Sequence, residues 1–292
     1  MRYYDIDSLD NRDPVAIARF ARLVEGLVLR WHPHHLSGME RIPEGPSLFV
    51  ANHSGGIWTP DSYMLGWAIY KTLGLDRMPY GLAHEVILSQ PPVNQILCPL
   101  GVVRASHDNA LRIFAAGRSA LVYPGGDYDA MRPYSRKDEV VFGDRRGYIR
   151  LALTAGVPIV PVATVGAHEV YRVLSDMRWL ARLIGADRWA RLKVMPLTLS
   201  FPLGLTLGPV VPFIANPTDI RQEFLPPIYF DRSGPEAAAD EAYVAACSAR
   251  VQGTIQIAMT RMADARRMAK LTPGGRPPRG PVLGSPWPPG PS

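Results

Sequence analysis

The residues best suited to chemistry lie in the stretch VANHSGGIWTPD, residues 50–61. Asn52 and His53 follow an apolar run, PSLFVA, that is typical of a buried strand. An imidazole titrates near neutrality, so it can act as a general base, and a carboxylate beside it would fix its tautomer and stabilise its charged form. The nearest acid is Asp61. We expect the glycine pair between them to let the chain turn tightly enough for Asp61 to fold back toward His53.

Each of these residues also has an ordinary structural role. A single histidine is more often a hydrogen-bonded structural residue than a catalytic one. Asp61 lies on the first turn of a predicted helix, where an acid can simply compensate the helix dipole. His53 is therefore a good candidate only in the company of further chemical groups.

Two other sets of polar or flexible residues accompany predicted strands. Arg104 lies within GVVRAS, and Pro124 leads into Gly125 and Gly126 after the run SALVY. In open α/β folds ligands gather at the carboxyl ends of strands, so we expect these groups to share one edge of the sheet with His53. An arginine can bind phosphate, and a glycine pair lets backbone N–H groups approach a ligand oxygen. The alternatives are a surface ion pair and an ordinary turn.

The elements that position these residues alternate between strand and helix patterns. This alternation predicts an α/β fold with a mixed, mostly parallel sheet flanked by helices. The expected strands cover residues 47–51, 101–106, 119–124 and 157–165, and the expected helices cover 59–74, a segment capped by Ser106, and 147–156.

Residues 13–31 are expected to form an N-terminal amphipathic helix, with Pro14 in its first turn. Its apolar stripe either packs on the domain or lies in a membrane interface. In the second case Arg19, Arg22 and Arg30 would face lipid phosphates.

Three segments follow from these patterns: an amphipathic helical segment at 1–35, an α/β domain at 36–270, and a disordered Pro/Gly tail at 271–292. Within the domain, residues 194–218 carry no charge, but their prolines argue against a membrane span. We expect them either to cover the core or to dip into an interface. Residues 235–270 are expected to form one long Ala-rich helix.

Composition limits the possible partners. The net charge of +6 comes mostly from arginine, which suits an anionic partner such as phospholipid headgroups, or reflects only a codon preference. Basic residues are not interleaved with aromatics, so we expect no nucleic acid. Cys98 and Cys247 make neither a disulfide framework nor a metal-binding spacing, which predicts a reducing compartment and no metal. The N-terminal residues are too acidic and polar for a signal peptide.

Four short sequence blocks, taken in chain order, resemble those of the glycerolipid acyltransferases, the lysophospholipid acyltransferase superfamily, over roughly residues 36–230. The look is closest to the diacylglycerol-acyltransferase-like branch, whose third block reads Pro-Gly-Gly where other branches have Pro-Glu-Gly. The matching blocks, in chain order, are Asn52-His53, Gly101 to Arg104, Pro124-Gly125-Gly126 and Val157 to Pro161.

The resemblance implies transfer of a fatty acyl group from a thioester, acyl-CoA as co-substrate, to a hydroxyl of a glycerolipid or lysophospholipid, with no bound cofactor. In this pattern His53 would deprotonate the acceptor hydroxyl, Asp61 would assist it, and Arg104 would hold a phosphate. Substrate would also contact Asn52, Pro124, Gly125 and Gly126. The implied partners are acyl-CoA, a lipid acceptor and a membrane surface, with the protein peripheral on the cytoplasmic face. No oligomeric state is predicted.

Two positions depart from the family pattern. The common His-x4-Asp spacing would put the acid at Trp58, so Asp61, eight residues after His53, would have to replace it. Gly125 stands where many relatives have Glu, which makes a neutral acceptor, such as diacylglycerol or a long-chain alcohol, an alternative to a phosphorylated one.

Two other functions remain as alternatives. One is a lipid-binding protein that keeps the fold but has lost activity, which the displaced acid would allow. The other is a lipid esterase, because HSGG is similar to an oxyanion loop. An esterase of that type needs a Gly-x-Ser-x-Gly nucleophile turn, which this sequence lacks.

Overall fold

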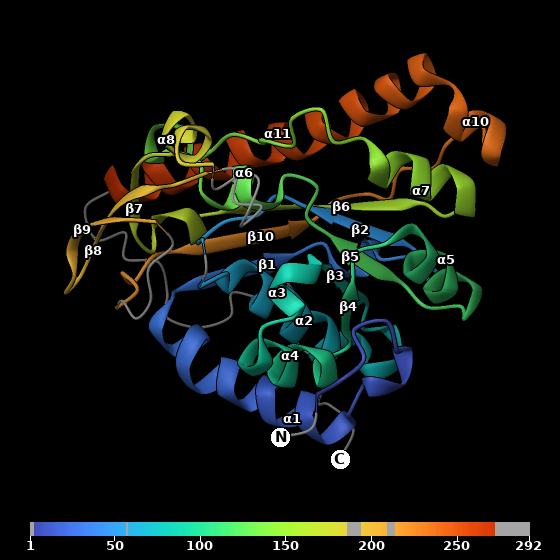
Figure 1. Cartoon of the computed structure of the whole chain (residues 1–292), viewed down its shortest axis with the longest axis horizontal. Coiled ribbons are helices and arrows are strands. Elements are labelled where there is room, and N and C mark those ends of the chain that lie inside the picture. Colours follow the sequence, from blue (N-terminus) through green and yellow to red (C-terminus); the bar gives the residue numbers. More distant parts are fainter. Residues whose placement is uncertain (1–2, 57, 186–193, 209–213, 272–292) are drawn as a thin grey trace.

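A seven-stranded sheet forms the centre of the protein, with strand order β1-β10-β6-β2-β5-β3-β4 (Figure 1). The computed structural model describes residues 3–56, 58–185, 194–208 and 214–271. Neighbouring strands are parallel except at the antiparallel pair of β10 and β6, which confirms the predicted mixed, mostly parallel sheet. The strands of this sheet are β1 His34–Ser37, β2 Leu48–Ala51, β3 Tyr80–Ala83, β4 Val102–Arg104, β5 Ala120–Val122, β6 Ile159–Val165 and β10 Ile220–Phe224.

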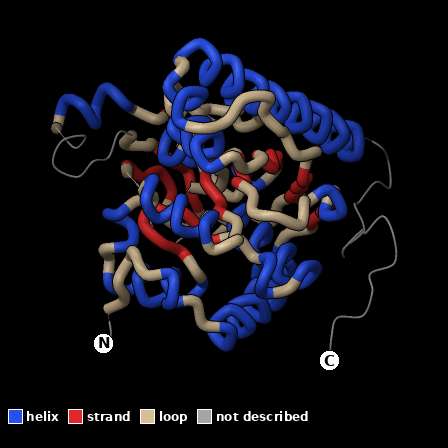
Figure 2. Tube along the Cα trace, turned by 90° about the vertical axis from the view of Figure 1, so that its right-hand side faces the viewer, coloured by secondary structure: helices blue, strands red, loops and turns tan. Residues whose placement is uncertain are grey.

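Helices cover both faces of this sheet, which gives the three layers seen in Figure 2. One face packs on α5, α7 and α11, and the opposite face packs on α2, where Leu65 and Ile69 meet Phe49 of β2. The helices are α1 Pro14–Leu23, α2 Pro60–Leu73, α3 Glu85–Leu88, α4 Pro91–Leu97, α5 His107–Ala115, α6 Gly126–Ala130, α7 Gly147–Ala155, α8 Arg178–Leu183, α10 Pro235–Ala239 and α11 Glu241–Leu271.

The N-terminal helix forms as predicted and packs on the domain along one side. Asp13 accepts a hydrogen bond from the Val15 amide and caps α1. The helix continues as a π-helical segment, η2, over Val24–Leu29, and buries Val24 and Val28 against Met64 of α2. The next strand, β1, starts at His34, so the boundary predicted between residues 35 and 36 falls inside a strand of the main sheet.

The C-terminal half holds a second sheet that the sequence analysis did not predict. It has the order β7-β8-β9 and is antiparallel, with strands Arg172–Ser175, Leu197–Ser200 and Gly204–Leu207. The last two strands are a hairpin within the uncharged segment 194–218, of which residues 209–213 lie outside the described part. Because β7 follows the carboxyl end of β6, the small sheet lies at that end of the large one (Figure 1).

The prediction of one continuous helix over residues 235–270 is wrong, because the helix is interrupted at Asp240. Asp240 adopts an extended conformation between α10 and α11, and its carboxylate accepts a hydrogen bond from the Tyr243 amide. It therefore acts as the N-terminal cap of a new helix. The tail predicted to be disordered lies, from residue 272 on, outside the described residues. Among the helices the structure describes, none is both long and apolar enough to span a bilayer.

Candidate functional site

His53 and Asp61 meet at the carboxyl end of β2, as the sequence suggested. His53 Nδ1 lies 3.1 Å from Asp61 Oδ2; the Asp61 side chain is fully buried, and that of His53 is 17% exposed. The contact is possible because Gly55 and Gly56 both have positive φ angles, 84° and 55°, which turn the loop back on itself. A side chain at Gly56 would collide with the Tyr171 hydroxyl.

Asp61 is fixed in place by further hydrogen bonds. Its Oδ2 accepts from the Ser54 amide at 2.7 Å, and its Oδ1 accepts from the Ser62 amide at 2.9 Å. A carboxylate with these donors is an acceptor only, so the His53 proton on this side belongs on Nδ1. Nε2 is then the basic nitrogen, and no described residue hydrogen-bonds to it.

The His53 ring is also held by an aromatic neighbour. Tyr123, just after β5, stacks on it with ring centroids 4.3 Å apart and an interplanar angle of 28°. Burial raises the pKa of Tyr123 well above its ordinary value, so the phenol stays neutral beside Asp61. The stack limits rotation of the imidazole about its side-chain bonds.

Beneath the His53 loop lies a fully buried ion pair, Asp129 with Arg132, whose Oδ1 and Nη1 atoms are 3.0 Å apart. Asp129 accepts from the His53 amide at 2.5 Å, while Arg132 donates to the His53 carbonyl at 2.6 Å and to Ser54 Oγ at 3.0 Å. Burial raises the pKa of Asp129, an effect that Arg132 opposes. This pair was not predicted from the sequence, although the two acids and the arginine that follow the glycine turn, in PGGDYDAMR, were a usable signal.

The Pro124-Gly125-Gly126 turn connects to the same network. A Cβ at Gly125 would lie 2.3 Å from Asp129 Cβ and 2.5 Å from the Val141 carbonyl oxygen, so this position has no room for the glutamate of other branches. Gly126 has a positive φ of 49°. Arg145 donates to the Gly125 carbonyl at 2.7 Å and to Asp127 at 2.8 Å, which places a second arginine at this turn.

Arg104 is not brought near His53. It ends β4, three strands away from β2 in the sheet order, a separation of about 14 Å at ordinary strand spacing. Its guanidinium holds both carboxylate oxygens of Asp7 at 2.8 and 2.7 Å, and these hydrogen bonds lower the pKa of Asp7. Its backbone amide donates to the Ile6 carbonyl at 2.8 Å, so the N-terminal segment lies along this edge strand.

Asn52 serves the framework. It is fully buried, its amide donates to the Thr164 carbonyl at 2.9 Å, and its side-chain oxygen accepts from the Thr164 amide at 2.8 Å. These two bonds tie the end of β2 to β6 and hold His53 at the sheet edge. They also use the groups with which Asn52 was expected to contact substrate.

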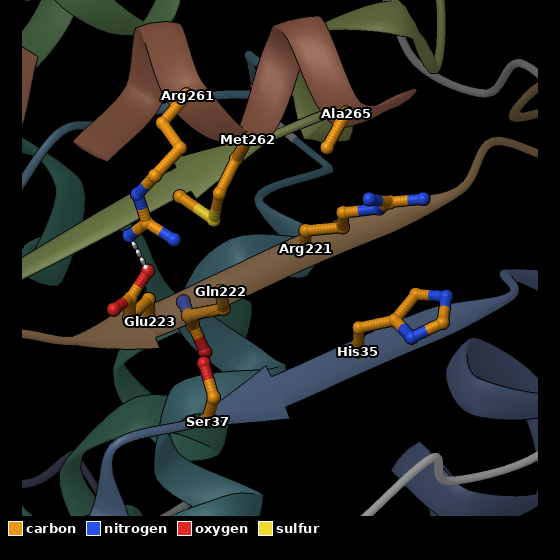
Figure 3. A pocket seen from close by; sticks show the side chains of 8 residues that line it. All are labelled: His35, Ser37, Arg221, Gln222, Glu223, Arg261, Met262 and Ala265. Atoms are coloured by element: carbon orange, nitrogen blue, oxygen red, sulfur yellow. Dashed lines mark hydrogen bonds and ion pairs between the residues drawn. The ribbon is translucent and has the colours of Figure 1, made fainter. Parts of the chain in front are cut away.

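A pocket lies elsewhere, between β1, β10 and α11 (Figure 3). Its charged side chains are paired within the protein: Arg261 bonds to Glu223, as Figure 3 shows, and Arg221 lies 3.1 Å from Asp219. It contains none of the predicted site residues. Within the described ranges, no cluster of His, Cys, Asp and Glu side chains has the arrangement of a metal site.

Comparison with known proteins places this site in a family. Residues 34–165 match the model of the Acyltransferase family, and this span contains His53, Asp61 and the Pro-Gly-Gly turn. The chain is also 27% identical over 195 residues to the DGAT1/2-independent enzyme synthesizing storage lipids of Mus musculus, covering 66% of this chain and 57% of that one. These matches support the glycerolipid acyltransferase superfamily for this chain. This confirms the resemblance read from the four sequence blocks.

Other relatives of this chain come from mycobacteria. It is 30% identical over 238 residues to uncharacterized proteins of Mycobacterium leprae and Mycobacterium tuberculosis. The match covers 81% of this chain and 62–63% of theirs, so it spans about three fifths of their length. The crystal structure of the 1-acyl-sn-glycerophosphate acyltransferase PlsC from Thermotoga maritima superposes with a TM-score of 0.51 at 17% identity, over 85% of this chain and 78% of that one, and shares its fold.

Proposed function

We propose that this protein transfers a fatty acyl group from acyl-CoA, or another thioester, to a hydroxyl of a glycerolipid or lysophospholipid. The observation that carries the proposal is the 3.1 Å contact between His53 Nδ1 and the buried Asp61 carboxylate at the carboxyl end of β2. Such a pair makes a general base of the remaining ring nitrogen. Family membership supplies the reaction class, and acyl-CoA is a co-substrate with no bound cofactor.

In the proposed reaction His53 Nε2 takes the proton of the acceptor hydroxyl while the oxygen attacks the thioester carbonyl carbon. The tetrahedral intermediate collapses, the C–S bond breaks, and the leaving thiolate receives the proton from the imidazolium. Asp61 stabilises the imidazolium in between. We assign the stabilisation of the oxyanion to the Gly125-Gly126 turn, which follows the carboxyl end of β5, the strand beside β2 in the sheet.

The position of Arg104 favours a neutral acceptor. About 14 Å of sheet separates it from β2, and Asp7 already occupies its guanidinium, so it is poorly placed to hold the phosphate of an acceptor whose hydroxyl lies at His53. Arg145 at the glycine turn is paired with Asp127. Diacylglycerol or a long-chain alcohol is therefore our preferred acceptor, and a membrane surface, on its cytoplasmic face, is the source from which it would come.

The two alternatives predict different products. A lipid-binding protein without activity would show no turnover with any acceptor, and an esterase would release free fatty acid. The inactive protein was an alternative because the acid is displaced from its usual spacing after His53. The loop brings Asp61 back to His53, and the hydrogen bond between them argues against this alternative.

Replacement of His53 by alanine tests the proposal. Purified protein is incubated with labelled acyl-CoA and a panel of lipid acceptors, and the products are identified by mass. We expect His53→Ala to lose at least about a thousandfold in rate, while His107→Ala, an exposed histidine at the start of α5, keeps the wild-type rate. A His53→Ala protein that transfers at the wild-type rate would refute the assignment.

A further inference from the structure

The small sheet has its apolar side facing outward. Strand pairing places Leu199 opposite Leu205, and Leu197 opposite Leu207, on the same side of the hairpin. We call the leucine face the side chains of Leu174, Leu199, Leu205 and Leu207, which are 49%, 44%, 62% and 50% exposed. An antiparallel sheet with one covered side normally presents polar side chains to water on the other.

The alternate side chains of the same strands face inward. Val173 and Thr198 are buried, and Thr198 and Thr206 share a hydrogen bond of 2.8 Å between their hydroxyls. The outward direction of the leucines is therefore set by the strand register, and a shift by one residue would expose threonines instead.

The apolar surface continues beyond the sheet. Phe201 at the hairpin turn is 67% exposed, and its carbonyl accepts from the amide of Ile214, itself 53% exposed. Trp31, after the N-terminal helix, donates its indole N–H to the Ala215 carbonyl at 2.6 Å and is 48% exposed. The leucine face, the hairpin turn and the end of the N-terminal helix are thus linked by direct contacts. Exposed apolar surfaces of this extent mark interaction sites.

The charges around this surface are positive. Arg172 pairs with Leu199 in the strand register, Arg30 precedes Trp31, and Arg182 lies in the last turn of α8. All three are exposed, and Arg172 lies over the Tyr134 ring. None of the three takes part in the ion pairs found among the described residues. Asp176, an acid between β7 and α8, is paired with Arg178. An apolar surface with arginines at its rim suits a layer of anionic lipid headgroups over acyl chains, because arginines can extend to the phosphates.

The same unit is built onto the candidate active site. Tyr171, immediately before β7, lies against Gly56 of the His53 loop, and it clusters with Val170 and Val173 beside Trp58. A packed cluster of a few residues therefore joins the leucine face to the His53 loop.

We propose that the leucine face, together with Phe201 and Trp31, docks on the surface of an anionic bilayer and presents the His53 loop to its lipids. This inference rests on the proposed function for the identity of the lipid, but the docking itself is tested without any acyl donor.

The experiment measures binding of the full chain to vesicles of phosphatidylcholine alone and of equal parts phosphatidylcholine and phosphatidylglycerol. We expect the double variant Phe201→Glu with Leu205→Glu to weaken binding at least about tenfold, because in the wild type both apolar side chains would be removed from water on docking. Leu199→Glu is a second, independent variant with the same expectation. Ile257→Glu is the matched control: Ile257 is 72% exposed but lies on α11, and its variant should bind as the wild type does.

Two further variants test the charged rim. Arg30→Gln and Arg182→Gln should each weaken binding to the anionic vesicles by roughly fivefold and leave binding to phosphatidylcholine alone unchanged. Equal binding of the wild type and the two leucine-face variants would overturn the proposal. So would a wild-type dimer in sedimentation that Leu199→Glu converts to a monomer, because the face would then belong to a second copy of the chain.

The outcome is separable from that of the proposed function. His53→Ala should bind vesicles as the wild type does, and the leucine-face variants should still transfer acyl groups to a short-chain, water-soluble alcohol. Vesicle binding that depends on the leucine face, without acyl transfer to any acceptor, would leave the docking surface standing and refute the enzymatic proposal. Loss of transfer to the soluble alcohol in both leucine-face variants would refute a role confined to docking.

Discussion

Replacement of Asp61 by asparagine is the sharpest test of the His53 site. The carboxylate accepts four hydrogen bonds: from His53 Nδ1 and the Ser54 amide on Oδ2, and from the Ser62 amide and hydroxyl on Oδ1. An amide has the same shape but only one accepting oxygen. Whichever way it is turned, its NH2 group faces at least one N–H donor.

The expected magnitude follows from these bonds. If the asparagine NH2 replaces Oδ2, it faces His53 Nδ1 and the Ser54 N–H, which loses its acceptor. The His53 ring proton then moves to Nε2, the nitrogen that must be the base. The same tautomer problem in a Ser-His-Asp triad costs about ten-thousandfold in kcat, which corresponds to about 5 kcal/mol of transition-state stabilisation. If the amide turns the other way, the partly buried Ser62 N–H loses its partner, and stability falls by about 1–3 kcal/mol. We expect the first effect to dominate, with KM little changed.

The assay is steady-state transfer from labelled acyl-CoA, with urea unfolding measured in parallel. Asp108→Asn is the matched control, since Asp108 is an exposed acid on the first turn of another helix, α5. If Asp61 only compensates the helix dipole, both variants should behave alike and stay within about threefold of the wild type. An Asp61→Asn enzyme within tenfold of the wild-type kcat would refute the reasoning.

Three further changes have expected outcomes. Gly125→Ala should lower the free energy of unfolding by about 1–3 kcal/mol and reduce the transfer rate, because its Cβ would meet Asp129 Cβ at 2.3 Å; Gly253→Ala, with open space around it, should not. Arg104→Gln should change kcat and the acceptor KM less than tenfold, and a rise in that KM of roughly a hundredfold would mean that Arg104 binds the acceptor after all. Burial lowers the pKa of His32 to about 4. Its folded pKa therefore lies below the unfolded value of about 6.5, and stability should fall by about 2–3 kcal/mol as the pH drops from 6.5 to 4.5. Urea unfolding at both pH values should show a smaller loss in His32→Asn.

The part of the site that depends on residues close together in the chain could be predicted from the sequence. A strand ending at Ala51, just before His53, a glycine pair and a helix starting at Pro60 were enough to anticipate the contact with Asp61, since all lie within a few residues of one another. Strand order is different, because it depends on how distant segments pair. The interposition of β5 and β3 between β2 and β4, which carries Arg104 away from His53, has no local signature.

Two other features escaped for related reasons. Arg132 reads as a surface residue in sequence, and only the packing of the loop after α6 buries it under His53. The small sheet was not predicted although leucine alternates with threonine in LTLS and GLTL, because the prolines and glycines between and around these runs read as interruptions of one uncharged segment rather than as the turn of a hairpin.

The bond from the Arg104 amide to the Ile6 carbonyl, reinforced by the Asp7 carboxylate, has a consequence for handling the protein. β4 is an edge strand of the large sheet, so its outer side would otherwise expose unpaired backbone N–H and C=O groups with which an extended segment of another molecule could pair. The segment that contains Ile6 and Asp7 covers this edge strand. Trimming it, or fusing a bulky partner to it, would uncover a strand ready to recruit another molecule, and precipitation on concentrating the sample is the result to expect.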